Sequence, residues 1–292
     1  KARIASAESL ELDPSTITID SPIPYPMDAF ISEVTTQRDK ISATSKHDSF
    51  NSILQKLAVL RQDSRMRFMM EPWNGECDPF AEIVSQFMGN GETVRIVDLS
   101  GMPNEIAGTA SAVIARTLFS VKLWQTQEER KKTPILLVCE EAHRYVPNRG
   151  EAQYEAAQDS IRRLAKEGRK YGIALMLVSQ RPNEVEATVL SQCNSWVVLR
   201  ISNDADRKHV QAILPDSFAG LTNVLSGLRR REAIFVGQAT MLPSRVLIRD
   251  LPQEKLPRSY DIDFDEGWQY DSVDEECLRE IGTRWRLQRR TE

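Results

Sequence analysis

Short apolar runs alternate with longer amphipathic segments along most of the chain. Runs of about four to eight apolar residues are typical of buried strands, and apolar residues spaced three and four apart are typical of helices. Strands that alternate with amphipathic helices predict a mostly parallel sheet that carries helices on both faces. The hydrophobic pattern therefore predicts an α/β protein.

The same pattern predicts the individual elements. The predicted strands are 94–100, 135–139, 173–180, 196–201, 233–236 and 246–248. The predicted helices are 49–60, 80–88, 104–121, 151–170, 204–213 and 217–226. The first helix begins after a cap at Asp48, and residues 34–48 are predicted to be a polar loop. The last two strands are close enough to form a hairpin, and three prolines in residues 20–26 exclude regular structure there.

Two regions of different character divide the chain. Residues 1–250 are predicted to form the α/β domain. Residues 251–292 read as a linker, an acidic stretch and a short helix that ends in RWRLQRR, so we expect a charged tail there.

Composition fits an ordinary soluble protein, because 41% of the 292 residues are hydrophobic and 27% are charged. We expect no membrane-spanning segment, because no uninterrupted apolar run approaches about 18 residues, and the first residues show no secretion signal. A cytoplasmic location is therefore expected. The four cysteines lie far apart without a CxxC pair, which argues against a zinc site or a disulfide framework.

Charge is distributed unevenly. The formal net charge is -4, yet residues 142–181 hold eight Lys or Arg against four Asp or Glu. Residues 261–280 hold nine acids and one arginine. A polyanion would have to bind a local basic surface, although on charge alone a solvated helix face is the simpler explanation.

An acidic pair directly follows the apolar run Ile135–Cys139. Glu140 and Glu141 stand where ligands bind in open parallel sheets, at the carboxyl end of a strand. Adjacent carboxylates repel each other, so such a pair usually serves a cation or a reacting water. The alternative is a solvated pair that opens a loop. His143 is expected to be a packing or capping residue rather than a general base.

These residues suit the hydrolysis of a nucleoside triphosphate. Glu141 suits activation of a water, and Glu140 suits Mg²⁺, which prefers carboxylate and water oxygens. Gln180 follows the next predicted strand, where its amide is expected to sense the terminal phosphate or position the water. The alternative is a plain surface residue at the end of a strand.

Arg169 lies in the loop that precedes the 173–180 strand, at the opposite end from Gln180. It is expected to reach a neighbouring subunit in a ring, as an arginine finger does, rather than its own site. Nearby rivals are Arg162, Arg163, Lys166 and Lys170. For each of these residues the alternative is a solvated helix charge.

No phosphate-binding GxxxxGK[ST] loop occurs among the 292 residues, although 13 glycines are present. We expect this loop to lie upstream of Lys1 in a longer polypeptide or to have been lost.

Three segments together resemble the carboxyl-terminal two-thirds of HerA-type ATPases, within the FtsK/HerA superfamily of hexameric DNA translocases. They read ILLVCEEAHRYVP, RLAKEGRKYGIALMLVSQRP and EAIFVGQATMLPSRV. The resemblance covers about residues 20–250 and implies a RecA-like P-loop NTPase core. It places Glu140 and Glu141 at the Walker B positions, Gln180 at the strand-end sensor and Arg169 at the trans-acting arginine.

The resemblance also implies a hexameric ring that hydrolyses ATP with Mg²⁺ and moves along double-stranded DNA. Expected partners are a NurA-type nuclease or an antiphage defence effector such as a sirtuin-like protein. Two features depart from the family: Glu140 stands where relatives often have aspartate, and neither the Walker A loop nor the amino-terminal barrel is present in this sequence.

Basic residues that we expect to contact DNA phosphates are Arg144, Arg149, Arg38, Lys40 and Lys46. Two other functions stay open. One is a non-hydrolysing ring scaffold that recruits an effector, and the other is a conjugation or secretion ATPase of the same superfamily.

Overall fold

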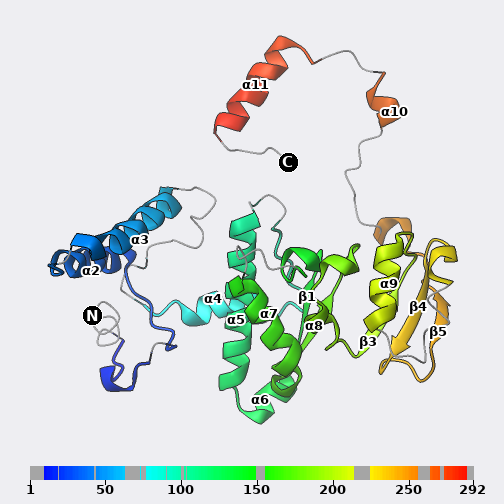
Figure 1. The fold of residues 1–292 in the computed structure, drawn as a ribbon, viewed down its shortest axis with the longest axis horizontal. Coiled ribbons are helices and arrows are strands. Elements are labelled where there is room, and N and C mark those ends of the chain that lie inside the picture. Colours follow the sequence, from blue (N-terminus) through cyan, green and yellow to red (C-terminus); the bar gives the residue numbers. More distant parts are fainter. Residues whose placement is uncertain are drawn as a thin grey trace. The chain divides into compact units, whose positions relative to one another are not determined.

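The computed structural model describes residues 10–18, 20–42, 44–62, 73, 77–89, 91–99, 102, 104–148, 155–213, 224–255, 264–269 and 273–287. The chain divides into two compact units, residues 1–247 and 248–292. Figure 1 shows the elements of both. The assignment of residues 1–250 to one domain stays a prediction.

The first unit begins with three helices, α2 (Met27–Asp39), α3 (Thr44–Gln62) and α4 (Phe80–Met88). The predicted loop at 34–48 is wrong because most of it is helical, and Asp48 lies inside α3 rather than at its cap. The hydroxyl groups of two threonines in α2 hydrogen-bond to the backbone of the same helix. Thr35 and Thr36 donate to backbone carbonyls four residues earlier, which lets a polar sequence remain helical.

The predicted strand 94–100 is wrong over its described residues. Residues 94–99 have no regular structure, and Ile96 is 88% exposed. A strand requires a hydrogen-bonding neighbour, and none of the strands in the described part of the chain pairs with this segment.

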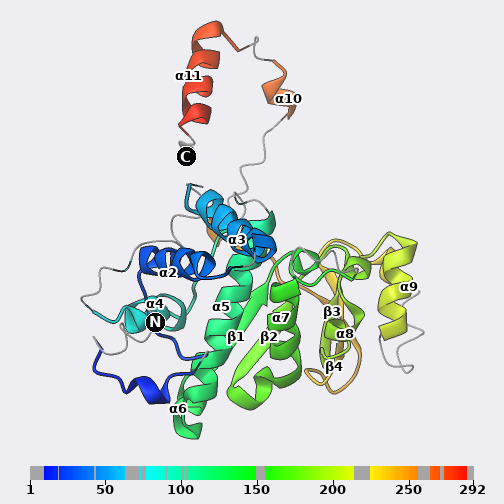
Figure 2. The ribbon, with the colours of Figure 1, turned by 60° about the vertical axis from the view of Figure 1, so that its left-hand side comes forward.

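Two parallel strands form the centre of the unit. The helices α5 (Asn104–Trp124) and α6 (Gln127–Lys132) lead into β1 (Ile135–Cys139). After the 3-10 turn η3 (Ala142–Arg144), α7 (Glu155–Glu167) and the 3-10 turn η5 (Gly168–Tyr171) return the chain to β2 (Ile173–Leu177). The two strands lie side by side (Figure 2). Ile135 pairs with Ile173 and Cys139 with Leu177.

One face of the β1–β2 pair carries the core. Buried residues of α5, α7 and both strands pack together, among them Phe119, Ile161, Leu164 and Ile173. The opposite face is open, because Leu136 is 59% exposed and Val138 and Met176 are also exposed. The prediction that β1 is covered on both faces is therefore wrong.

A second sheet is antiparallel, in the order β3–β4–β5. Its strands are β3 (Ser195–Val198), β4 (Glu232–Gly237) and β5 (Ser244–Leu247). The turn η6 (Pro182–Glu184) and helix α8 (Ala187–Leu190) precede it, and α9 (Asp204–Ile213) follows β3. The predicted β4–β5 hairpin is confirmed. The mostly parallel sheet is not, since β1–β2 is the one parallel pair among the described residues.

A second hydrophobic cluster, which includes Val198, Val210 and Val236, lies at the antiparallel sheet. Trp196 joins the two sheets, because it packs against this cluster and against the core of the β1–β2 pair. The chain turns sharply beside it at Gly237, where φ is 102° and an added Cβ would lie 2.1 Å from the Asn194 carbonyl oxygen. Glycine is therefore required at this turn.

Helix α5 departs from one expectation. Its residues Ile106–Trp124 are long and apolar enough, by length and composition, to cross a membrane. Ala115 and Phe119 nevertheless pack in the core, and one such helix is weak evidence for a membrane span. The cytoplasmic location stays a prediction.

The second unit contains η8 (Gln253–Lys255), α10 (Phe264–Gly267) and α11 (Glu275–Arg286). The Asp274 carboxylate accepts a hydrogen bond from the Cys277 backbone N–H and caps α11. The short helix predicted near the end of the chain is therefore present.

Candidate functional site

The acidic pair bulges from the end of β1. The Val178 N–H donates to the Cys139 carbonyl, and the Ala142 N–H donates to the Val178 carbonyl, both at 2.9 Å. Val178, the residue directly after β2, is therefore hydrogen-bonded to the residues on either side of the acidic pair. Glu140 and Glu141 protrude between these two hydrogen bonds. Glu141 has φ 50° and ψ 52°, a left-handed conformation that costs a non-glycine residue about 1–2 kcal/mol.

Residues from both strand ends meet at the Glu141 carboxylate. The Gln180 amide Nε2 donates to Glu141 Oε1 at 3.0 Å. The His143 Nδ1 lies 3.4 Å from Glu141 Oε2 and 3.4 Å from Ser179 Oγ. Glu141 keeps 39% of its side chain exposed, so the cluster is open to a ligand. The structure therefore brings Glu141 and Gln180, which follow β1 and β2 respectively, into contact.

His143 and Ser179 are the residues that sequence reasoning missed. His143 was expected only to pack or cap, whereas its ring contacts the candidate catalytic carboxylate. Both lie close in sequence to predicted site residues, since Ser179 directly precedes Gln180 and His143 follows Glu141 by two residues, but this spacing does not signal the contact.

Glu140 is exposed and, in the described part of the chain, makes no hydrogen bond or ion pair. No cluster of three or more His, Cys, Asp or Glu that could hold a metal occurs among the described residues. The donor set fits a cation that takes one or two carboxylates and completes its shell with water and phosphate oxygens, which is typical of Mg²⁺. Burial is the main cause that raises the pKa of nearby Tyr145.

The loop after η3 is fixed to the segment after β2. Pro147 pairs with Val185 in an isolated bridge, and the Glu186 N–H donates to the Val146 carbonyl at 2.9 Å. Val146 and Val185 are fully buried. The acidic pair therefore stands on a rigid base rather than on a free loop.

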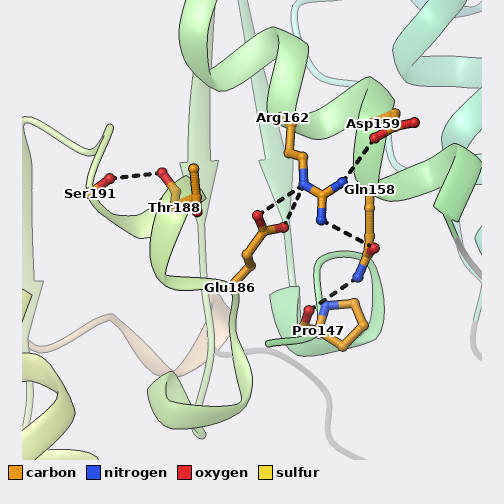
Figure 3. Close-up of polar contacts among 7 residues, drawn as sticks. All are labelled: Pro147, Gln158, Asp159, Arg162, Glu186, Thr188 and Ser191. Atoms are coloured by element: carbon orange, nitrogen blue, oxygen red, sulfur yellow. Dashed lines mark hydrogen bonds and ion pairs between the residues drawn. The ribbon is translucent and has the colours of Figure 1, made fainter. Parts of the chain in front are cut away.

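Arg162 joins α7 to the same region (Figure 3). Its Nε lies 2.9 and 2.8 Å from the two carboxylate oxygens of Glu186, and its Nη1 bonds Asp159 at 2.9 Å. Gln158 adds a bond from Nε2 to the Pro147 carbonyl at 3.1 Å. The hydrogen bond to Glu186 is the main cause that raises the pKa of Arg162. These bonds give Arg162 a structural role within its own subunit.

Arg169 lies in η5, before β2, and the structure does not bring it to the acidic pair. The backbone of the preceding residue, Gly168, packs closely against β2, since a Cβ added there would lie 2.9 Å from the Ile173 carbonyl oxygen. The Tyr171 ring packs edge-on against Phe119 at 5.2 Å between centroids. The Arg169 side chain is exposed on this fixed turn. The rival Arg163 instead stacks over Phe119, with 4.2 Å from its Cζ to the ring centroid.

The candidate DNA-contacting residues are spread over the chain. Arg144 and Lys40 are exposed. Arg38 is engaged with the Asp39 carboxylate at 2.8 Å and donates to Asn51 at 3.2 Å. Arg149 and the side chain of Lys46 lie outside the described residues. The three described side chains lie on different segments: Arg38 near the end of α2, Lys40 directly after α2, and Arg144 in η3.

Comparison with known proteins shows sequence similarity to HerA helicases. No protein-family model matches the chain. The chain is 39% identical over 115 residues to the DNA double-strand break repair helicase HerA of Pyrococcus furiosus, which is 39% of this chain and 20% of that protein. It is 31% identical over 180 residues to HerA of Sulfolobus acidocaldarius, which is 60% of this chain and 35% of that protein. The chain resembles the HerA-type ATPases.

The HerA-like sequence spans about a fifth to a third of the length of these two relatives. In structure, the chain is similar to VirB4 of Thermoanaerobacter pseudethanolicus, with a TM-score of 0.53, 16% identity, and coverage of 86% of this chain and 62% of that one. At this identity the likeness concerns the fold alone.

Proposed function

We propose that this HerA-like chain is part of an ATP-hydrolysing subunit that moves along double-stranded DNA and has a RecA-like core. The observation that carries the proposal is the 3.0 Å hydrogen bond between Gln180 and Glu141 at the carboxyl ends of β2 and β1. A carboxylate and an amide at this edge of a parallel pair suit the positioning of a water beside a terminal phosphate. The sequence similarity to HerA helicases supports ATP as the nucleotide.

Each residue of the edge has a chemical role in this proposal. The Glu141 carboxylate accepts a proton from the attacking water, and Gln180 orients the carboxylate and the water. Glu140 would hold Mg²⁺, which offsets the negative charge of the phosphate oxygens when it is bound.

Hydrolysis also needs a phosphate-binding group. The 292 residues contain no GxxxxGK[ST] loop, so such a group must be supplied from outside these residues. This requirement separates the leading proposal from a non-hydrolysing scaffold, which would need no such group.

The exposed position of Arg169 supports a ring. It lies before β2 on a fixed turn, away from the acidic pair of its own subunit. We propose that it reaches the nucleotide of the adjacent subunit in a hexamer, where it offsets charge in the transition state. Double-stranded DNA would pass through the ring, with Arg144 and Lys40 among the exposed basic residues available to its phosphates.

The partner also belongs to the proposal. A NurA-type nuclease or a defence effector such as a sirtuin-like protein is proposed to act with the ring, on the basis of the resemblance alone. A conjugation or secretion ATPase is a weaker alternative, because the likeness to VirB4 concerns the fold and not the substrate.

The first prediction tests the role of Glu141. In the full-length protein, Glu141→Gln keeps an acceptor for Gln180 but removes the base, so kcat for ATP should fall by about 10²–10⁴-fold. Binding of a fluorescent ATP analogue should stay unchanged. Steady-state phosphate release and an equilibrium titration measure the two quantities.

The matched control is Glu128→Gln. Glu128 is an exposed residue of α6 whose carboxylate bonds Lys131, and its loss should leave hydrolysis unchanged. Wild-type turnover by the Glu141→Gln protein would refute the proposed function. A wild-type protein that binds DNA but hydrolyses no ATP would favour the alternative function, the non-hydrolysing scaffold.

A further inference from the structure

His143 and Ser179 form a second layer behind the candidate base. Glu141 is a long side chain on a protruding, left-handed residue, and such a side chain has several rotamers of similar energy when nothing restrains it. In this structure both of its oxygens are engaged, Oε1 by Gln180 and Oε2 by His143. Ser179 contacts the same His143 nitrogen from β2's end.

The position of Ser179 is itself fixed. Its Oγ accepts a hydrogen bond from the Arg181 backbone N–H at 3.0 Å, so the hydroxyl oxygen cannot move without losing that bond. The oxygen therefore presents a lone pair and a fixed contact point to His143. His143 is mostly buried, with 21% of its side chain exposed, which limits rotation of the ring.

The contact with the carboxylate selects one form of the neutral ring, whereas the Ser179 hydroxyl can accept from or donate to Nδ1. If Nδ1 carries the proton, it donates toward both Glu141 Oε2 and Ser179 Oγ, and both are acceptors. If Nε2 carries the proton, the Nδ1 lone pair faces a carboxylate, which is repulsive. The negative charge of Glu141 therefore favours the Nδ1–H form. At 3.4 Å the contacts are long, as catalytic hydrogen bonds often are before substrate binds.

We propose that His143, held by Ser179, is a positioning residue that orients the Glu141 carboxylate through Nδ1–H. The inference rests on the proposed function, because the orientation matters only if Glu141 activates a water. The left-handed conformation of Glu141 makes the contact geometrically possible, since it turns the chain so that His143 lies beside the carboxylate two residues earlier.

Substitutions that differ in whether they place a hydrogen-bond donor at the Nδ1 position test the contact between His143 and Glu141. In His143→Asn the side-chain amide nitrogen takes the place of Nδ1, so kcat for ATP should stay within about threefold of wild type. His143→Gln and His143→Ala lack a donor at that place, and kcat should fall by about 10–100-fold with KM within about twofold, as expected for a misplaced base. Ser179→Ala should lower kcat by a smaller factor.

The outcomes distinguish this inference from the proposed function. Loss of hydrolysis in Glu141→Gln together with full activity in His143→Ala would overturn the positioning role and leave the proposed function standing. Equal losses in His143→Asn and His143→Ala would also overturn it, because the Nδ1 position would then not matter. Full activity in Glu141→Gln would refute the proposed function itself.

A spectroscopic measurement covers the case in which a variant fails to fold. Nitrogen-15 labelling of histidine in the wild-type protein shows which ring nitrogen carries the proton, and whichever His143 variant folds assigns the signal from His143 by its loss. The Nδ1–H form in the wild-type protein supports the inference. The Nε2–H form would overturn it, whatever the activity of the variants.

Discussion

At the scale of single residues, the site depends on a strained backbone at Glu141. The left-handed conformation is held by the two hydrogen bonds of Val178 on either side of the acidic pair. Strain of this kind persists where the surrounding structure over-determines it, and it is common at functional sites. Here it places a carboxylate beside residues from two separate strands.

The strain can be measured with two substitutions at the same position. Both Glu141→Gly and Glu141→Ala remove the carboxylate and its contacts, but only glycine adopts a positive φ without cost. The free energy of unfolding of Glu141→Gly should exceed that of Glu141→Ala by about 1 kcal/mol, after allowance for the entropy of glycine. Urea titrations compare the two proteins. Equal stability, or a less stable glycine variant, would show that the conformation is not strained.

Sequence reasoning placed Glu141 and Gln180 each just after a strand, and their contact in the structure has a general reason. The carboxyl ends of neighbouring parallel strands meet at one edge, so polar residues that follow both strands come together. It missed His143 because that contact depends on the φ of one glutamate, and neither residue type nor spacing signals a left-handed glutamate. The contact became visible only with the backbone.

At the scale of elements, a buried lysine fastens α5 to the start of β1. Lys122 is fully buried, and its Nζ donates to Gln125 at 3.0 Å, to the Thr133 hydroxyl at 2.8 Å and to the Thr133 carbonyl. Burial, followed by the nearby Arg130 charge, lowers the pKa of Lys122. Lys122 thus supplies hydrogen-bond donors to the chain just before β1 begins.

Replacing this lysine should weaken the join. Lys122→Met keeps the apolar stem but removes the three hydrogen bonds that the buried ammonium donates, so the free energy of unfolding should fall by about 1–3 kcal/mol. Lys132→Met, an exposed change in the last turn of α6, should alter it by less than about 0.5 kcal/mol. Thermal and urea unfolding of both variants measure the difference. A Lys122→Met protein as stable as wild type would contradict the role.

Elements with a self-contained signal were predicted well. The bounds of β1 follow from five apolar residues between a proline and two glutamates, and α9 was predicted at 204–213 as observed. The polar helix α2 was missed because its threonines resemble loop residues. Residues 94–99 were predicted as a strand because the alternating pattern says nothing of whether a partner strand is present.

At the scale of the whole molecule, the proposal requires that two subunits share each site. The support for assembly in the first unit is the exposed Arg169, which lies away from the acidic pair of its own subunit. A mixing experiment tests the sharing, because Glu141 and Arg169 would come from different chains at every interface.

Mixed rings should regain activity. Rings of Arg169→Ala alone or of Glu141→Gln alone should be inactive, because every interface lacks one group. In a random equimolar mixture about a quarter of the interfaces combine an intact Glu141 from one variant with an intact Arg169 from the other. ATP turnover should therefore rise well above that of either variant.

The control for mixing is Lys170→Ala, which changes the neighbouring exposed charge and should leave turnover unchanged. An arginine that serves its own subunit predicts no recovery, since no chain in the mixture carries both groups. Absence of recovery would thus contradict the shared site.

Helix α7 gives the subunit a fixed internal spacing. It starts beside the loop that supports the acidic pair, to which Gln158 and Arg162 fasten it, and it ends at the turn that carries Arg169. Its 13 residues form a rod about 20 Å long that cannot stretch without unwinding. A tilt imposed at one end of α7 must appear at the other end. In the proposed ring, nucleotide binding at one site would therefore move the Arg169 turn that faces the next site.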